Sequence, residues 1–313
     1  MQIQALTAGA GAGTAAFDGF VHSVFTRACN IVQHGDKRLL TLATRDVGAL
    51  PRGFQLATPA GFNFLDHVRI GTPVASRAGI LRIHDSTLSV DTRSARPWSA
   101  ISASSVLDFA RKEVVCAWET AYFMLLEQRH KIGLPSQAMV AIAALLHAIR
   151  LRQGEDAARM AVALIGLGEG LTPAGDDFLV GFLAALRIAG ASDPVHHAFF
   201  TVFSNAIAAA AFRTNVISRS YLEAATNGEV SEPLSAVIEC IACGAAPEIV
   251  RARVSNVFAV GASSGKSAML GFLLGAVAWE GRNPISETIH YIDRYVRSEI
   301  FALFAAQPHV GMR

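Results

Sequence analysis

Residues 166–189 read GLGEGLTPAGDDFLVGFLAALRIA, and this stretch combines a glycine-rich loop with an apolar run. Glycine permits positive φ angles and close approach of two backbones. Thr172 can cap a helix, and Pro173 suits the first helical position. Residues 178–189, which follow, are apolar except for Arg187. The stretch therefore predicts a loop that enters a buried helix over residues 174–189.

A second segment of the chain repeats this pattern. Residues 174–183, AGDDFLVGFL, align without gaps with residues 264–273, SGKSAMLGFL. A glycine-containing loop precedes each copy, at residues 166–170 and 261–263. The unpaired N–H groups and the positive dipole end of a helix start attract anions. The repeat thus predicts two helix starts that bind a small anion, in one shared pocket if the two starts meet.

Two other interpretations of these glycines stay open. Gly271 and Gly275 form a G-x-x-x-G face, and Gly181 can act in the same way, so the glycines can serve helix packing alone. Residues 261–267, GASSGKS, are one residue shorter than the nucleotide-binding pattern G-x4-G-K-[ST]. That pattern follows a strand, whereas the preceding residues have a helical pattern. We therefore rank nucleoside triphosphate hydrolysis below anion binding.

Upstream of the helices, residues 17–98 contain short alternating or β-branched runs separated by turn residues, which predict strands. The runs cover residues 21–32, 38–44, 54–58 and 80–90. The last run predicts a hairpin that turns at His84-Asp85-Ser86. Several short strands in about 80 residues favour a small barrel or sandwich.

From Ser104 onward the pattern is helical. Ser104 or Ser105 can cap a helix that runs to about Arg129, and Ser136 begins another. Further helices are predicted over residues 155–165, 174–189, 194–212, 215–227, 232–243, 247–257, 265–280 and 285–305. The predicted fold class is α+β, with a small β-rich barrel or sandwich followed by a larger all-α bundle. We expect a flexible N-terminus (1–16), a β-rich domain (17–100) and a helical domain (101–313) that carries both glycine-rich loops.

The amino-acid composition restricts the classes to which this protein can belong. Of the 313 residues, 52% are hydrophobic and 17% are charged, which suits a large buried core. The longest apolar run, Ala268–Trp279, is shorter than the roughly 18 residues that a membrane-spanning helix needs. No secretory signal is evident, and the net charge of +2 does not suggest nucleic-acid binding. We expect a cytoplasmic protein without a membrane or nucleic-acid partner.

Other reactive residues give weaker signals. Cys240-x-x-Cys243 lacks a second pair of ligands and lies in an apolar helical pattern, so we predict no metal site there. The sequence contains no H-E-x-x-H pattern of zinc-dependent hydrolases. His22 on the first predicted strand has a structural role in this interpretation.

Residues 166–179, GLGEGLTPAGDDFL, closely resemble the signature of the AllH-type family, the H subunit of oxamate carbamoyltransferase, long a domain of unknown function. The strand at 21–25 and the segment 213–222 agree, so the resemblance extends over residues 20–280. The family's second motif is closer to GHSSGWD, where this chain has GASSGKS at 261–267. The resemblance implies a subunit of a multi-protein carbamoyltransferase of anaerobic allantoin degradation, which acts with other subunits.

That enzyme exchanges a carbamoyl group between phosphate and the amide nitrogen of oxamate. In degradation, oxalurate and phosphate give oxamate and carbamoyl phosphate. A site for this reaction must hold a phosphate or carboxylate group, polarise a carbonyl oxygen and orient the attacking nitrogen. Asp176 and Asp177 are the catalytic candidates, because a carboxylate can orient an amide or bind Mg2+. Both equally suit the dipole of a helix start, and Mg2+ is the one cofactor left open.

The candidates for substrate binding are small residues of the loops, hydroxyls and two cations. They are Gly168, Gly170, Thr172, Gly175, Arg213, Thr214, Ser218, Ser263, Ser264, Gly265 and Lys266. Arg213 and Lys266 can make charge-assisted contacts with an anion. Thr214 and Ser218 lie one helical turn apart, and Thr214 suits a cap as well.

Three functions remain in competition. The first is an enzyme subunit for carbamoyl transfer that needs its partners. The second is a non-catalytic module that binds a small acid or scaffolds the complex. The third is a structural protein whose glycines only pack helices. Homo-oligomerisation is left open by the sequence.

Overall fold

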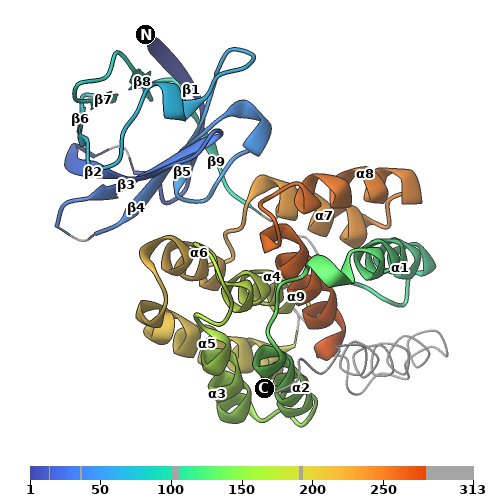
Figure 1. Cartoon of the computed structure of the whole chain (residues 1–313). Coiled ribbons are helices and arrows are strands. Elements are labelled where there is room, and N and C mark those ends of the chain that lie inside the picture. The colour runs from blue at the N-terminus through green and yellow to red at the C-terminus, as the bar shows by residue number, and fades with distance from the viewer. Residues whose placement is uncertain (14, 36, 101–105, 190–192, 280–313) are drawn as a thin grey trace, which may run out of the picture.

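The computed structural model of this chain describes residues 1–13, 15–35, 37–100, 106–189 and 193–279. It has two parts, a barrel of β-strands and a larger helical region that follows it (Figure 1). The predicted fold class is confirmed, and the β-rich part is a barrel.

Nine strands form one sheet, and their bounds are β1 (Gln2–Gly9), β2 (Phe17–Val24), β3 (Ala28–Gln33), β4 (Leu39–Ala43), β5 (Gly53–Leu56), β6 (Pro73–Arg77), β7 (Ile80–Ile83), β8 (Ser89–Asp91) and β9 (Arg96–Trp98). Strand β1 pairs with β5 on one side and with β8 on the other, so the sheet closes into a barrel. Strand β9 extends the pairing along the end of β1. Alternate side chains fill the interior, among them Val21, Leu40, Leu42 and Leu56.

The structure corrects two of the sequence predictions for the strands. Residues 2–9, which we expected to be flexible, form β1, whose Ile3 and Ala5 are buried in the barrel. The run at 21–32 is two strands, because β2 ends at Val24 and β3 begins at Ala28. The hairpin of β7 and β8 is as predicted, and Asp85 at its turn has a φ of 54°.

The helical region contains α1 (Lys112–Glu127), α2 (Ser136–Arg150), α3 (Gly154–Leu164), α4 (Ala174–Ile188), α5 (Pro194–Ala210), α6 (Val216–Thr226), α7 (Glu232–Cys243), α8 (Pro247–Phe258) and α9 (Ser264–Ala278). These follow the predicted ranges closely except the first, which begins at Lys112. The predicted cap at Ser104 or Ser105 and the helix at 285–305 lie outside the described residues.

Helices α4 and α9, the two copies of the repeat, pack side by side at the centre of this region (Figure 1). A Cβ atom on Gly181 would lie 1.8 Å from the Ala268 carbonyl oxygen. One on Gly271 would lie 1.9 Å from the Phe178 carbonyl oxygen. Phe178 and Ala268 are equivalent in the repeat, as are the two glycines, so the contact is reciprocal. Gly275, one turn after Gly271, meets the carbonyl oxygen of Phe182, one turn after Phe178, so the two helices run parallel with both starts at the same end.

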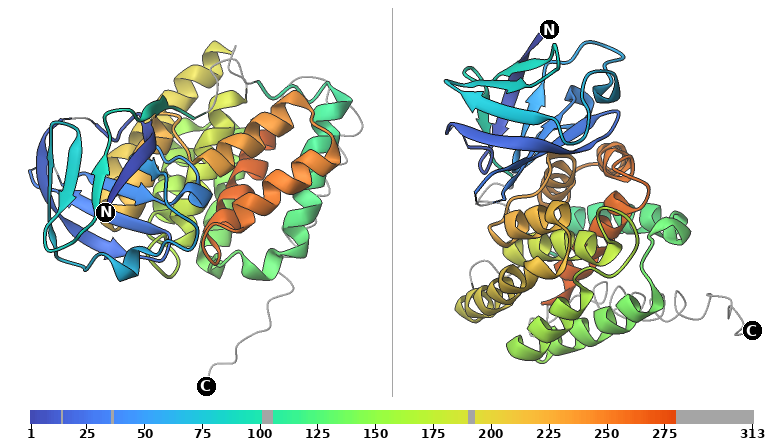
Figure 2. Two further views of the ribbon diagram at one scale, coloured as in Figure 1. Left: turned by 90° about the horizontal axis from the view of Figure 1, so that it is seen from above. Right: turned by 60° about the vertical axis from the view of Figure 1, so that its left-hand side comes forward.

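The barrel sits over one end of the helical region, next to α6 and α7 (Figure 2). The backbone N–H of Ala49 donates to Glu232 Oε2 at 2.7 Å, and the N–H of Glu232 donates to the Ala49 carbonyl oxygen at 2.9 Å. Leu39 and Ile217 belong to an apolar cluster across the same junction. The two parts therefore meet through both backbone pairing and apolar burial.

One helical stretch among the described residues, Pro194–Arg213, is long and apolar enough to cross a membrane by length and composition alone. A core helix of a soluble protein passes the same test, so this is weak evidence for a membrane span. Phe199, Phe203 and Ile207 on this stretch are buried within the helical core.

Candidate functional site

The two glycine-rich loops meet where α4 and α9 begin. The Thr172 and Ser264 hydroxyl oxygens lie 2.8 Å apart and share a hydrogen bond. Thr172 belongs to the first loop and Ser264 begins α9. Because the helices are parallel, their positive dipole ends point at the same place.

A cavity of about 600 Å³ opens at this meeting point, between the barrel and the helical region. The loops contribute Gly170, Thr172, Ser263 and Ser264, and α4 contributes Asp177. The barrel supplies Asn30 and Thr41, while Tyr221 comes from α6, Glu229 from the loop after it and Leu234 from α7. The cavity is large enough for a small organic ligand.

Asp177 lines this cavity from the first turn of α4. Its Oδ2 atom is buried and has no hydrogen-bond partner among the described residues. Burial raises the pKa of Asp177 from 3.8 to about 7, against hydrogen bonds from Ser264 and Thr172 that lower it, and the nearby Asp176 raises it further. A carboxyl group with a pKa near neutrality can both accept and donate a proton.

Asp176 differs although it is the neighbouring residue. It is 1% exposed and receives hydrogen bonds from the Gly166 N–H at 2.8 Å and from Thr214 Oγ1 at 2.6 Å. Burial raises its pKa, and the hydrogen bonds from Thr214, Gly166 and Ser218 oppose that rise. Asp176 therefore ties the first glycine loop to the start of α6.

Polar side chains of the barrel and of α6 line the cavity together. Tyr221 of α6 lies beside Thr41, and Thr41 Oγ1 donates to Asn30 Oδ1 at 2.7 Å. Asn30 Nδ2 in turn donates to Ser23 Oγ at 3.0 Å. Burial raises the pKa of Tyr221 to about 12, and the charge of Asp177 adds to the rise. Sequence reasoning missed these barrel residues, whose one signal is a polar side chain within an apolar strand.

Two family models match the chain on either side of this cavity. The model described as oxamate carbamoyltransferase subunit AllH matches residues 164–276, which include both glycine loops. The model described as the AllH family N-terminal domain matches residues 3–97, which form the barrel. This chain belongs to the AllH family. No solved structure matches it.

Neither predicted cation lies in the cavity of this AllH protein. Lys266 is 7% exposed, and its Nζ donates to the carbonyl oxygens of Phe258 at 3.0 Å and Ala262 at 2.9 Å. Its pKa is lowered by burial and by the charge of Lys131. Arg213 is exposed outside the cavity lining. Among the described residues that line the cavity, none is a lysine or an arginine.

The other predicted residues divide between lining the cavity and shaping the backbone. Gly170, Thr172, Ser263, Ser264 and Gly265 line it, whereas Gly168, Gly175, Thr214 and Ser218 do not. The N–H of Gly175 donates to the Leu167 carbonyl oxygen at 2.8 Å, and that of Gly265 to the Val260 carbonyl oxygen at 3.1 Å. These two N–H groups of the helix starts are thus already used within the protein.

The cavity continues into a second one of about 640 Å³, with which it shares residues such as Phe25, Val47 and Gly261. Arg27, Arg45 and Arg253 line this outer part, together with the acids Asp46 and Glu232. In the part of the AllH chain that the structure describes, no group of three His, Cys, Asp or Glu side chains is placed to hold a metal ion.

Proposed function

We propose that this AllH-family chain supplies the site that binds the amide substrate of a carbamoyltransferase, with Asp177 as the acid–base group. The observation that carries the proposal is the buried Oδ2 atom of Asp177, which has no protein partner, on a residue that lines the cavity. An unpaired buried carboxylate oxygen is costly in free energy, and a ligand N–H group would satisfy it. The family match supplies the class of reaction.

The proposed step is a transfer between nitrogen and phosphate oxygen. The amide nitrogen of oxamate attacks the carbonyl carbon of carbamoyl phosphate, a C–N bond forms, the C–O bond to phosphate breaks, and phosphate leaves. The proton lost by the nitrogen passes to the Asp177 carboxylate. In the reverse direction protonated Asp177 returns that proton to the nitrogen of oxalurate while phosphate accepts the carbamoyl group.

The cavity suits the amide end of such a substrate. The hydroxyls of Thr172 and Ser264 lie beside Asp177 and can bind a carbonyl oxygen. The carboxylate end of oxamate would point toward the outer cavity, where Arg27 and Arg253 supply positive charge. We also propose that the chain acts in the cytoplasm with the other subunits of the transferase.

The test measures carbamoyl transfer by the complete enzyme with Asp177→Asn in this subunit. Loss of a general acid–base group lowers kcat by about 10²- to 10⁴-fold. Glu169→Gln is the matched control, because Glu169 lines the same cavity on the exposed loop and keeps its shape on losing the charge. The control should keep activity within a few fold.

A second result separates catalysis from binding alone. Thermal unfolding of the chain with oxamate should show stabilisation of the wild type, by about 2.7 kcal/mol at 100 times the dissociation constant. If Asp177→Asn weakens oxamate binding but leaves turnover at saturating oxamate unchanged, the subunit is a non-catalytic ligand-binding module. That outcome would refute the acid–base role.

A further inference from the structure

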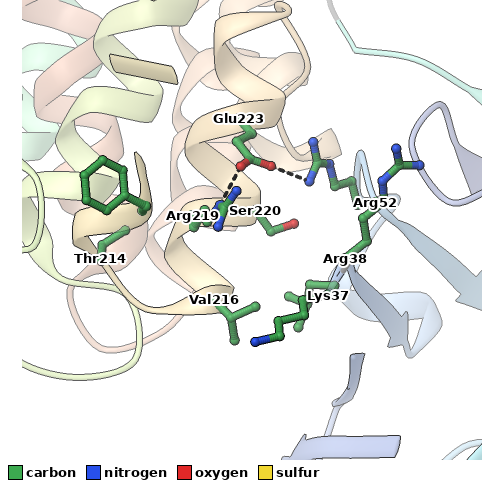
Figure 3. A pocket seen from close by; sticks show the side chains of 10 residues that line it. Lys37, Arg38, Arg52, Thr214, Val216, Arg219, Ser220 and Glu223 are labelled. Atoms are coloured by element: carbon green, nitrogen blue, oxygen red, sulfur yellow. Dashed lines mark hydrogen bonds and ion pairs between the residues drawn. The ribbon is translucent and has the colours of Figure 1, made fainter. Parts of the chain in front are cut away.

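A third, smaller hollow lies on the other side of α6, at the junction with the barrel, and has a volume of about 170 Å³ (Figure 3). The barrel lines it with Lys37, Arg38 and Arg52, and α6 lines it with Arg219, Ser220 and Glu223. It shares no lining residue with the large cavity. Helix α6 separates the two, with Ile217 and Tyr221 toward the cavity.

Positive charge dominates this hollow. Its described lining sets Lys37, Arg52 and Arg219 against one carboxylate, Glu223, an excess of two positive charges, and Arg38, which also lines it, has an interaction of its own. Glu223 accepts from Arg52 Nη1 at 2.9 Å and from Arg219 Nε at 2.6 Å, so one acid already bridges two arginines (Figure 3). These hydrogen bonds together with neighbouring charge lower the pKa of Glu223, although its partial burial opposes this.

We propose that this hollow binds a phosphate-type oxyanion, at a site separate from the Asp177 cavity. The three cations Lys37, Arg52 and Arg219 around one carboxylate repel one another, and an anion among them reduces that repulsion. A guanidinium has five N–H donors in a planar fork that matches phosphate oxygens, and Glu223 accepts from Nη1 of Arg52 and from Nε of Arg219. The side chain of Lys37 extends across the hollow toward Val216, opposite Arg52 (Figure 3).

The size and the lining restrict the ligand class. A hollow of about 170 Å³ holds a phosphate group and little more, whereas the main cavity is several times larger. Arg52 and Glu223 side chains keep 23% and 25% of their surface exposed, so the anion would be partly shielded from water and salt. The occupant is therefore inorganic phosphate or the phosphate group of a small metabolite.

The test is a calorimetric titration of the full chain with inorganic phosphate at low and at physiological ionic strength. Arg219→Gln and Lys37→Gln each remove one charged contact from the hollow, and each should weaken phosphate binding by about tenfold or more. Arg159→Gln is the matched control, since Arg159 also pairs with an acid on its own helix, Asp156, but lies on α3. The control should bind phosphate as the wild type does.

Two other outcomes of this titration would contradict the phosphate site. Lack of phosphate binding at millimolar concentration, or binding that survives both Arg219→Gln and Lys37→Gln, overturns the proposal. Circular dichroism of each variant verifies that it folds. The titration with Asp177→Asn keeps the two proposals apart, because that variant should keep the phosphate binding that Arg219→Gln and Lys37→Gln weaken, while it loses carbamoyl transfer.

Discussion

The start of α4 and the start of α9 have the same backbone plan and different chemistry. Each begins after a glycine loop, and each carries a glycine whose Cβ position is filled by a carbonyl oxygen of the helix before it, Leu164 for Gly175 and Val257 for Gly265. At the next position, however, α4 has Asp176, which accepts hydrogen bonds, and α9 has Lys266, which donates them. Both helix starts have a glycine where the backbones pack closely, whereas the residues next to these glycines form different hydrogen bonds.

The difference places the proposed acid–base group on one copy alone. Asp177 of α4 lines the cavity and has an unpaired oxygen, whereas its equivalent in α9, Ser267, donates to the Ile132 carbonyl oxygen at 2.5 Å and is fully buried. The α9 start contributes Ser263 and Ser264 to the cavity wall instead. A duplicated scaffold can thus bring two helix starts together and still form an asymmetric site.

The largest effect is expected from breaking the contact that both copies share. Gly271→Val places side-chain atoms where the Phe178 carbonyl oxygen lies, and it should lower the free energy of unfolding by about 4 to 5 kcal/mol. Urea denaturation measures this change. Gly154→Ala is the control, because a Cβ atom there meets Phe199 at an ordinary 3.6 Å and should change stability little.

The next effect distinguishes Asp177 from Ser267 through pH. The pKa of Asp177 is raised from 3.8 to about 7 in the folded chain, so the folded state binds the proton more tightly than the unfolded state. This contribution to stability is complete below about pH 4 and is lost as pH rises through 7, by up to about 4 kcal/mol. Relative to Asp177→Asn, the wild type should lose stability over this range.

Denaturation at several pH values measures that loss. The comparison with α9 supplies the control, because Ser267→Ala removes a hydrogen bond but no titrating group, so its effect should not vary with pH. Parallel pH profiles for wild type and Asp177→Asn would show that the Asp177 carboxyl group has an ordinary pKa.

A smaller effect tests whether Asp176 is structural. Asp176→Asn replaces an acceptor of several hydrogen bonds, including those from Gly166 and Thr214, and should cost about 2 to 3 kcal/mol of unfolding free energy. Oxamate affinity measured at a temperature where the variant is folded should change little. An affinity loss as large as that of Asp177→Asn would instead give Asp176 a direct role in binding.

The smallest effect measures the contact between the two loops. Thr172 and Ser264 share one hydrogen bond, and a double-mutant cycle with Thr172→Val and Ser264→Ala should give a coupling of about 1 kcal/mol. Denaturation of the four proteins provides the cycle. Strict additivity of the two single changes would mean that the loops do not stabilise each other through this bond.

The sequence predicted the order of elements well because periodicity and turn residues are local signals. The helix bounds of α2 to α9 lie within a few residues of the expected ranges, since each has its own apolar face and end signals. The strand β1 was missed, because its sequence QIQALTAG alternates only weakly and its partners are distant residues such as Leu56 and Val90.

The candidate site was predicted in part. The repeat indicated that both glycine loops matter, and Thr172, Asp177 and Ser264 do lie together in the cavity. The prediction that Lys266 contacts an anion was not met, because its Nζ donates to the carbonyl oxygen of Phe258 at the end of α8 and to that of Ala262 in the following loop. The basic hollow was not predicted, since Lys37, Arg52 and Arg219 are far apart in the sequence.

The sequence by itself determined the α+β class, the family and the duplicated helix starts, because these depend on local residue patterns. The tertiary structure alone decided that the helix starts are parallel and adjacent, that Asp176 is saturated with hydrogen bonds while Asp177 is not, and that the barrel completes the cavity. The physical reason is that burial, hydrogen-bond pairing and pKa depend on neighbours distant in the chain, and the identity of those neighbours is settled only when the core packs.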